Sequence, residues 1–231
     1  MDIAIVVAII ALAGTIANAG ITLFGSRWLS DLQQRSKTRA ILDRYRNPLA
    51  SATYDLQSRF YNIIRMNFLD TYYIEDRNGK RDVAAESTLY VIGQYLAWSE
   101  ILRRELQFLD FRNRDQTRKV ARAQEQIATL FASDDPELGP AFMLWRPEQR
   151  AIGERMISSD TNVPSCIGFA TFAERRRTEA LQRWFGQLEQ DLEIVAKSSS
   201  ARLRLLQHEL VALVLLLDSD GRFDREKLNE A

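Results

Sequence analysis

The amino-acid sequence predicts an all-α protein, in which an N-terminal transmembrane helix continues into a stalk and is followed by a soluble bundle of about five or six helices. Residues 3–26 carry no charged side chain, and apolar residues then recur every three or four positions along most of the chain. Glycine and proline, which interrupt helices, account for only 10 and 5 of the 231 residues. We therefore predict an anchor over residues 1–26, a basic stalk over residues 27–47 and a helical bundle over residues 48–231.

The uncharged run is long enough to cross a membrane, because a helix of this length spans a hydrocarbon core of about 30 Å. Asp2 precedes the run, and basic residues follow it: Arg27, Arg35, Lys37, Arg39, Arg44 and Arg46. The positive-inside rule then places the N-terminus outside and the rest of the chain in the cytoplasm, as a single-pass protein of the inner (plasma) membrane. The first four of these cations are candidates for contact with anionic lipid headgroups, or they belong to a solvated helix face.

Two other interpretations of the run stay open. Ala17, Asn18 and Ala19 match the small-residue pattern of a signal-peptide cleavage site, although no basic residue precedes the run. A buried helix of a soluble protein is also compatible with the run, although its length favours a membrane span.

Small and polar residues form a stripe along the predicted anchor. Their spacing alternates between four and three, which places them on one helix face: Ala4, Ala8, Ala11, Thr15, Asn18, Thr22 and Gly25. Membrane helices associate through close packing of small residues and through interhelical hydrogen bonds, so we expect a homo-oligomer with Asn18 at the contact. Alternatively, the stripe arises by chance from residues that are common in membrane helices, or Thr15, Asn18 and Thr22 line a narrow pore.

The soluble body is predicted as a series of helices separated by short breaks. Asn47-Pro48 is expected to end the stalk, since proline disfavours helix at the residue before it. Asn78-Gly79 indicates a tight turn or a short hairpin, and residues 165–177 fit either a strand or a buried helix. Helices are expected at residues 49–69, 86–109, 115–132, 178–197 and 201–217, together with a short one opened by Pro147.

The sequence RPEQRAIGER, residues 146–155, contains the most suggestive charged motif of the body. With the preceding tryptophan it supplies five candidate site residues: Trp145, Arg146, Glu148, Arg150 and Glu154. Arg150 and Glu154 are four apart and share a helix face, whereas Glu148 and Glu154 do not. Either glutamate is a candidate general acid or base, and the alternative is a salt-bridged structural helix.

The remaining candidates for chemistry are weaker. His208 is the single histidine and Cys166 the single cysteine, so a multi-histidine metal site and an internal disulfide are excluded. We expect both side chains to be structural. The sequence DSDGRFDRE resembles half of a calcium loop, but aligning Gly221 with the loop glycine puts Lys227 where a carboxylate ligand is required.

Charged residues elsewhere in the chain give little further indication of a binding site or a partner. A basic cluster at residues 175–177 is a candidate for a phosphate, a lipid headgroup or an acidic partner, or it is a solvated face. Glu100 and Arg104, four apart, are expected to pair on a helix surface. The formal net charge is +0, so no nucleic-acid partner is expected, and no cofactor or metal site is predicted.

Three stretches of the body are similar to a known set of proteins: YRNPLASATYDLQSRFYNI (residues 45–63), YVIGQYLAWSEILRRELQFLD (residues 90–110) and RPEQRAIGERM (residues 146–156). Together they resemble an uncharacterised family of bacterial and plant proteins with an N-terminal transmembrane segment and a helical cytosolic domain. The similarity covers most of the chain. It implies the same architecture and assigns no function to any residue.

These features favour a non-enzymatic scaffold or regulator that works by self-association and by binding an unidentified protein partner at the cytoplasmic membrane face. One alternative is a membrane effector whose oligomerised N-terminal helices form a pore under the control of the body. Another is a helical enzyme that uses Glu148 or Glu154 on a small or lipid substrate.

Overall fold

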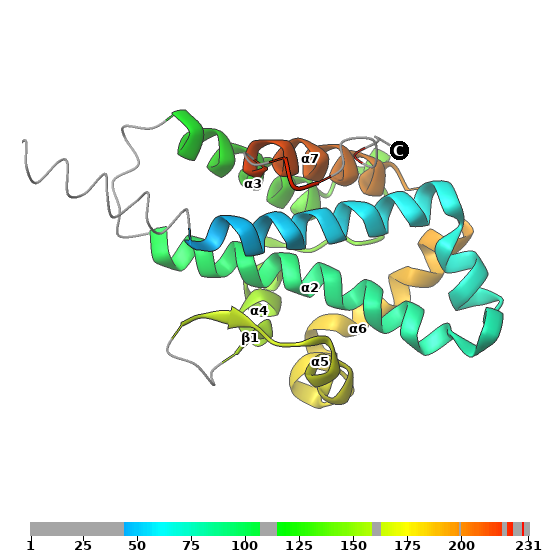
Figure 1. Ribbon diagram of the computed structural model, residues 1–231. Helices are drawn as coiled ribbons and strands as arrows, with labels where there is room; N and C mark the ends of the chain where they lie inside the picture. The colour runs from blue at the N-terminus through cyan, green and yellow to red at the C-terminus, as the bar shows by residue number, and fades with distance from the viewer. Residues whose placement is uncertain are drawn as a thin grey trace, which may run out of the picture. The chain divides into compact units, whose positions relative to one another are not determined.

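The computed structural model describes residues 44–106, 115–158, 163–198, 200–218, 221–223 and 228. The predicted anchor, its small-residue stripe and the lipid-headgroup candidates therefore lie outside the described residues. All described residues belong to one compact unit, Leu42–Ala231 (Figure 1). In these ranges, no helix combines the length and the apolar character that crossing a membrane requires.

Helices make up most of the described chain, which confirms the predicted all-α class for the body. One helix covers residues 44–66, and a π-helix, Asp70–Ile74, and a 3-10 helix, Arg77–Gly79, follow it. The further helices are α2 (Arg81–Leu106), α3 (Asp115–Ala132), a 3-10 helix (Pro136–Leu138), α4 (Arg146–Met156), α5 (Phe169–Arg175), α6 (Glu179–Lys197) and α7 (Ala201–Leu217). Two short strands, β1 (Ile157–Ser158) and β2 (Ser165–Cys166), pair antiparallel with Ile157 opposite Cys166.

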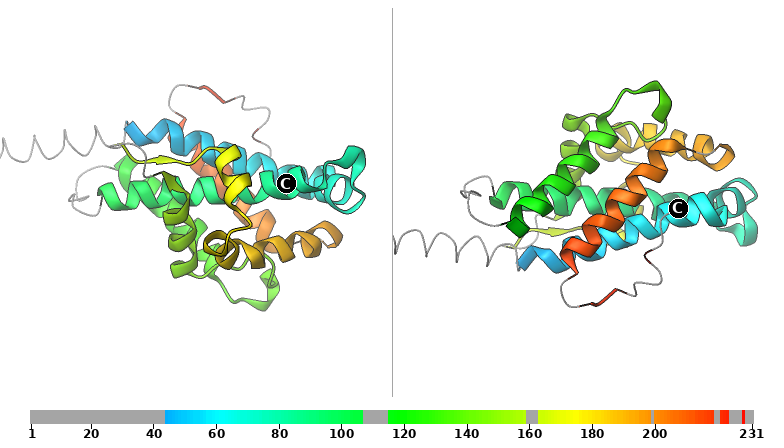
Figure 2. Two further views of the ribbon diagram at one scale, coloured as in Figure 1. Left: turned by 90° about the horizontal axis from the view of Figure 1, so that it is seen from below. Right: turned by 90° about the horizontal axis from the view of Figure 1, so that it is seen from above.

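The helix at residues 44–66 and α2 run side by side through the bundle (Figure 1). On one side of this pair, α3 and α7 pack against each other, and on the other side α4 packs across α2 and contacts α6. Seen from above, α7 lies over the helix at residues 44–66 (Figure 2). A hydrogen bond of 3.2 Å from Gln207 Nε2 to Gln57 Oε1 joins these two helices inside the bundle.

Aromatic side chains from distant segments form much of the core. Phe60, Phe131, Phe142, Phe172 and Phe185 are all buried. The rings of Phe172 and Phe185, from α5 and α6, lie 5.1 Å apart between centroids. Burial of such large apolar groups is the main term that holds the helices together.

The predicted break at Asn47-Pro48 is wrong, because the chain is helical on both sides of Pro48. Tyr45 and Leu49 are buried before and after it, at 3% and 0% exposed. Arg46 Nε also donates a hydrogen bond to Leu217 O over 2.5 Å. Burial of the apolar face offsets the amide hydrogen bond that proline cannot make.

The turn at Asn78-Gly79 is confirmed, but it is a 3-10 turn between helices rather than a hairpin. Asp76, Asn78 and Gly79 have positive φ angles of 52°, 63° and 64°, which these residue types tolerate. Asp76 Oδ1 accepts a hydrogen bond of 2.8 Å from Arg81 N. This contact starts α2 at Arg81, before the predicted residue 86.

Other boundaries agree with the predictions. The bounds of α3 and α7 are those expected, Pro147 stands in the first turn of α4, and Thr178 directly precedes α6. Residues 165–177 contain both structures that their pattern allowed, first β2 and then α5.

Candidate functional site

The charged motif at residues 146–155 lies within α4, which crosses α2. Gly153 allows the two helices to approach closely, since a Cβ atom there would lie 2.6 Å from Leu96 O and 2.9 Å from Glu100 Cβ. Pro147 stands where a helix needs no amide hydrogen bond. These two residues therefore suit α4 to its place against α2.

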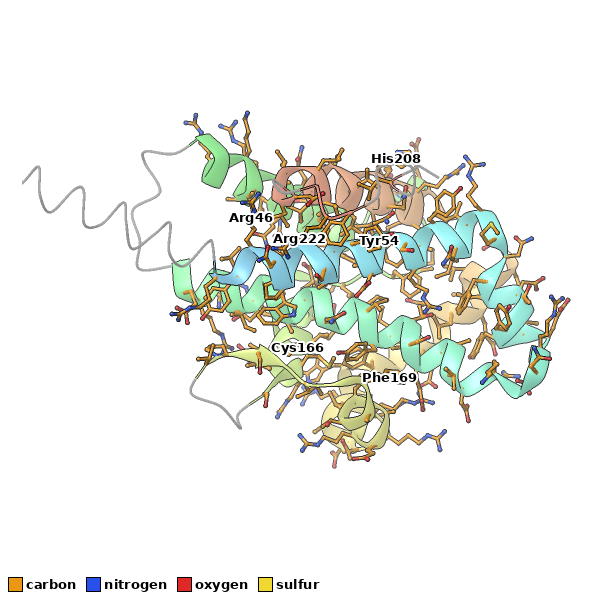
Figure 3. All side chains as sticks on the ribbon, viewed as in Figure 1. Arg46, Tyr54, Cys166, Phe169, His208 and Arg222 are labelled. Atoms are coloured by element: carbon orange, nitrogen blue, oxygen red, sulfur yellow. The ribbon has the colours of Figure 1, made fainter. Side chains whose placement is uncertain are left out.

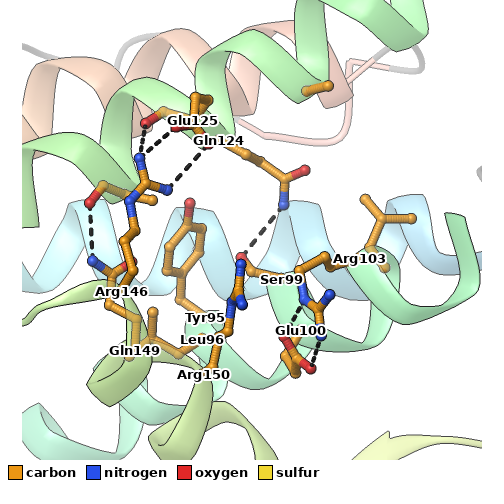
Figure 4. Close-up of a pocket in the computed structure, with 13 residues that line it drawn as sticks. Tyr95, Leu96, Ser99, Glu100, Arg103, Gln124, Glu125, Arg146, Gln149 and Arg150 are labelled. Carbon is orange, nitrogen blue, oxygen red and sulfur yellow. Dashed lines mark hydrogen bonds and ion pairs between the residues drawn. The ribbon is translucent and has the colours of Figure 1, made fainter. Parts of the chain in front are cut away.

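Two side chains of α4 join it to α3. Arg146 pairs with Glu125, with 2.5 Å between Nη2 and Oε1, and donates to Thr129 Oγ1 over 2.8 Å. Gln149 is buried and donates to Ala128 O over 2.9 Å (Figure 4). Since α4 is held to both α2 and α3, the space where the three helices meet has a defined shape.

That space is a pocket of about 340 Å³. Its lining is largely apolar and includes Leu96, Leu102 and Ala128. Polar groups enter from each helix, among them Ser99 on α2 and Gln124 on α3, which contact each other over 3.4 Å (Figure 4). A concave apolar site with a few polar groups is the usual form of a ligand-binding pocket.

Arginine and glutamate side chains set the charge of the pocket. Arg103 pairs with Glu100, with 2.7 Å between Nε and Oε2, and Arg146 pairs with Glu125. Arg150 also lines the pocket, is exposed, and forms no ion pair with any described residue. Arg150 is therefore the one pocket cation without a carboxylate partner in the described part of the chain.

Glu100 forms the predicted pair with Arg104, but not on the surface, because the glutamate is only 3% exposed. Arg104 Nε lies 2.7 Å from Glu100 Oε1, and Arg103 adds two hydrogen bonds of 2.7 Å. Burial by itself raises the pKa of Glu100, but the hydrogen bonds from both arginines outweigh it and hold that pKa below the usual 4.5. A charged carboxylate is thus maintained beside the crossing of α2 and α4.

The five candidate residues of the motif do not converge on one space. Glu148 Oε2 accepts a hydrogen bond of 2.8 Å from Trp145 N and so caps the start of α4, while the Trp145 side chain is exposed. Glu154 pairs with Arg104 over 2.8 Å, and no described contact joins it to Arg150. Of the five residues, only the two arginines line the pocket between α2, α3 and α4.

His208 and Cys166 lie on different sides of the bundle, on α7 and β2 (Figure 3). Burial raises the pKa of the Cys166 thiol to about 12, against the smaller opposing effect of a hydrogen bond with Tyr90. The Tyr90 hydroxyl itself donates to Ile167 O over 3.1 Å. A thiol with this pKa stays protonated near neutral pH and is a poor nucleophile.

The basic cluster at residues 175–177 is not a single exposed surface. Arg176 is 5% exposed and pairs with Glu86 over 2.9 Å and with Glu189 over 2.7 Å. The guanidinium group therefore links α2 to α6 in the interior, where a ligand does not reach it.

The stretch that resembles half of a calcium loop begins at Asp218, directly after the end of α7. Asp218 accepts hydrogen bonds of 2.8 Å from Arg222 N and 3.2 Å from Phe223 N. The ring of Phe223 stacks on Tyr54 with 4.6 Å between centroids. Across the described ranges, no three histidine, cysteine, aspartate or glutamate side chains are grouped as a metal ion would require.

Several pocket residues are missing from the sequence-based prediction, namely Ser99, Arg103, Gln124 and Gln149. They come from three helices, and only the crossing of these helices brings them together. Gly153 is a local signal for this crossing, because a glycine inside a helix often marks a close packing contact.

Comparisons of the chain with protein-family models, with curated proteins and with solved structures find no match.

Proposed function

We propose that this protein is a single-pass, membrane-anchored binding protein that self-associates and holds a partner at the cytoplasmic membrane face. The anchor in this proposal is the uncharged run of residues 3–26, whose length suits a membrane span. The observation that carries the binding role is Arg150, a cation that has no carboxylate partner among the described residues and lies at an open and largely apolar pocket. Pockets of this kind bind through apolar contact and gain specificity from a few polar groups.

The pocket favours a partner segment that places an apolar side chain beside a carboxylate. The other two arginines already pair with glutamates, so an incoming carboxylate would pair with Arg150, whose planar guanidinium suits a two-point contact. Ser99 and Gln124 share only a long contact of 3.4 Å, which a partner's polar group can replace at little cost.

Photocross-linking from inside the pocket tests this proposal. In one variant of the full chain a photoreactive amino acid replaces Gln124, and in a separate control variant the same amino acid replaces Lys119. Both variants are expressed in the protein's native membrane. Both positions lie on α3, but only residue 124 lines the pocket. We expect a discrete adduct from position 124 alone, and Arg150→Glu should abolish it because the new charge repels a carboxylate.

A matched charge reversal separates the pocket from general electrostatics. Arg155→Glu makes the same change on α4, outside this pocket, and should leave the adduct intact. Equal adducts from positions 124 and 119, or an adduct that survives Arg150→Glu, would contradict the binding role.

A pore-forming effector is the second candidate, and the stripe from Ala4 to Gly25 favours it. Polar residues on one face of associated membrane helices can line an ion path. Ion leakage from vesicles that hold the full chain, lost when residues 1–26 are removed, would support this candidate. Vesicles that stay tight with the full chain inserted would exclude it.

The geometry gives no support to an enzyme based on Glu148 and Glu154. A general acid or base must come within hydrogen-bond reach of a substrate proton. Glu148 instead caps α4, and Glu154 pairs with Arg104.

A further inference from the structure

A second pocket, of about 390 Å³, lies between the end of the helix at residues 44–66, the end of α6 and the start of α7. Its lining is mostly polar and contains three cations, Arg65, Lys197 and Arg204. None of the described residues that line it is acidic. In charge and polarity it differs from the pocket between α2, α3 and α4.

Within the described part of the chain, the three cations have no carboxylate partners. All are exposed, and no described residue forms an ion pair with any of them. By contrast, Arg81 at the start of α2 pairs with Glu193 of α6, with 3.9 Å between Nη2 and Oε1. Like charges gathered around one space repel one another, so an anion in that space would be stabilised by all three.

Neutral donors border the same pocket. Asn67 follows the helix at residues 44–66 in a left-handed conformation, with φ of 49°, and its amide side chain adds to the lining. Ser200 Oγ accepts a hydrogen bond of 3.2 Å from Leu203 N, so its hydroxyl hydrogen remains available to a ligand. The start of α7 adds a partial positive charge to that of the side chains.

We infer that this pocket binds the phosphate group of a phosphomonoester. A phosphate carries up to two charges and three terminal oxygens, and therefore matches three cations and neutral donors better than a carboxylate does. The group occurs both on soluble phosphorylated metabolites and on the headgroup of phosphatidic acid. No described residue lines both pockets, so the inference does not rest on the proposed function.

Calorimetric titration of the full chain in non-ionic detergent tests the site, with ionic strength held constant by potassium chloride. The probes are glycerol 3-phosphate and short-chain phosphatidic acid, and the controls are glycerol and short-chain phosphatidylcholine, which lacks a phosphomonoester. We expect saturable binding of at least one probe. Changing Arg65, Lys197 and Arg204 together to Gln should weaken it by about tenfold or more, since charge-assisted hydrogen bonds are lost.

A matched triple variant changes three exposed cations outside the pocket to Gln: Lys119, Arg122 and Arg155. It should keep the affinity of the unmodified protein. Circular dichroism verifies that both triple variants fold. If the pocket variant does not fold, the single substitution Arg204→Gln tests the site instead, and we expect it to weaken probe binding by a few-fold.

The outcomes of the titration separate a soluble ligand from a membrane lipid and either support or overturn the phosphate site. Binding of glycerol 3-phosphate identifies a soluble source, binding of phosphatidic acid alone identifies a membrane source, and either result supports the site. Unchanged affinity in the pocket variant, an equal loss in the matched variant, or no saturable binding of either probe overturns it.

Discussion

At Glu100, burial and ion pairing act in opposite directions on one carboxylate. Its side chain is almost fully buried, and it accepts three hydrogen bonds of 2.7 Å from Arg103 and Arg104. Removal of a charge from water is costly, but the two guanidinium groups outweigh this cost and keep the pKa below the usual value.

The lowered pKa of Glu100 makes stability depend on pH. The folded state favours the ionised carboxylate, so its contribution is complete above the unfolded pKa of about 4.5 and is lost as the pH falls through the folded pKa. We expect the free energy of unfolding of the unmodified protein to fall more steeply on acidification than that of Glu100→Gln. Urea denaturation from about pH 7 to pH 3 measures this difference, and parallel curves would contradict it.

Cys166 offers a test of reactivity at one thiol. Because burial raises its pKa to about 12, little thiolate exists at pH 8 in the folded protein. We expect iodoacetamide to alkylate Cys166 at least about 50-fold more slowly in the folded chain than in denaturant. The sequence has one cysteine, so mass spectrometry follows this thiol alone, and equal rates would show that it is unprotected.

At the scale of secondary-structure elements, the crossing of α2 and α4 depends on a glycine. Gly153→Ala would place a methyl group 2.6 Å from Leu96 O, a backbone atom that cannot move without separating the helices. We expect a loss of about 2 kcal/mol or more in the free energy of unfolding, measured by denaturant titration.

Gly186→Ala on α6 is the matched control for this substitution. Its new methyl group would meet only the flexible end of Gln182, at 3.2 Å, and alanine favours a helix by up to about 1 kcal/mol over glycine. A Gly153→Ala variant as stable as Gly186→Ala would contradict the tight crossing.

A buried arginine joins α7 to the end of α3. Arg202 is 0% exposed and donates to four backbone carbonyls, those of Leu130, Phe131, Ser133 and Gly139. Carbonyls at a helix C-terminus have no partner within the helix. Burial lowers the pKa of Arg202, while Asp135 and Asp191 act to raise it.

Arg202→Leu would remove the guanidinium donor from these four carbonyls, of which Phe131 O would still accept a hydrogen bond of 2.8 Å from Leu144 N. We expect a loss of about 3 kcal/mol or more in the free energy of unfolding, with a smaller loss for Arg202→Lys, which keeps the charge. The exposed Lys119→Leu should change stability by less than about 0.5 kcal/mol. A loss for Arg202→Leu no larger than that of Lys119→Leu would show that the buried contacts contribute little.

At the scale of the whole molecule, charge is balanced overall but not locally. The sequence has 31 basic and 31 acidic residues, yet one pocket keeps a single unpaired arginine and the other gathers three unpaired cations among the described residues. Local fields of this kind act on ligands even when the net charge is zero. The two pockets therefore suit different anions.

Self-association is the further prediction at this scale. If the small-residue stripe holds anchors together, Asn18→Leu should weaken association by about 1 kcal/mol per contact. Light scattering of the full chain in detergent measures the change, and Ile16→Leu, which alters a bulky residue outside the stripe, should have no effect. A monomeric unmodified chain, or unchanged association of Asn18→Leu, would contradict the prediction.

Helices with regular apolar spacing were predictable from the sequence, and α3 and α7 have the expected bounds. The helix across Pro48 was not, because its continuation depends on Tyr45 and Leu49 being buried by other helices. The charged motif in α4 was recognised in the sequence, but the partners of its two glutamates were not. Glu148 accepts a hydrogen bond from Trp145 N at the helix start, and Glu154 pairs with Arg104 of α2.

By itself, the sequence determined the helical class of the body, the uncharged N-terminal run and the charge difference across that run, since each is a pattern among neighbouring residues. Only the tertiary structure decided that Glu100 is buried and that Arg150 has no carboxylate partner among the residues that the structure describes. It also brought Arg65, Lys197 and Arg204 from three helices to one pocket. Contacts between residues far apart in the chain depend on how helices cross, and local periodicity does not encode those crossings.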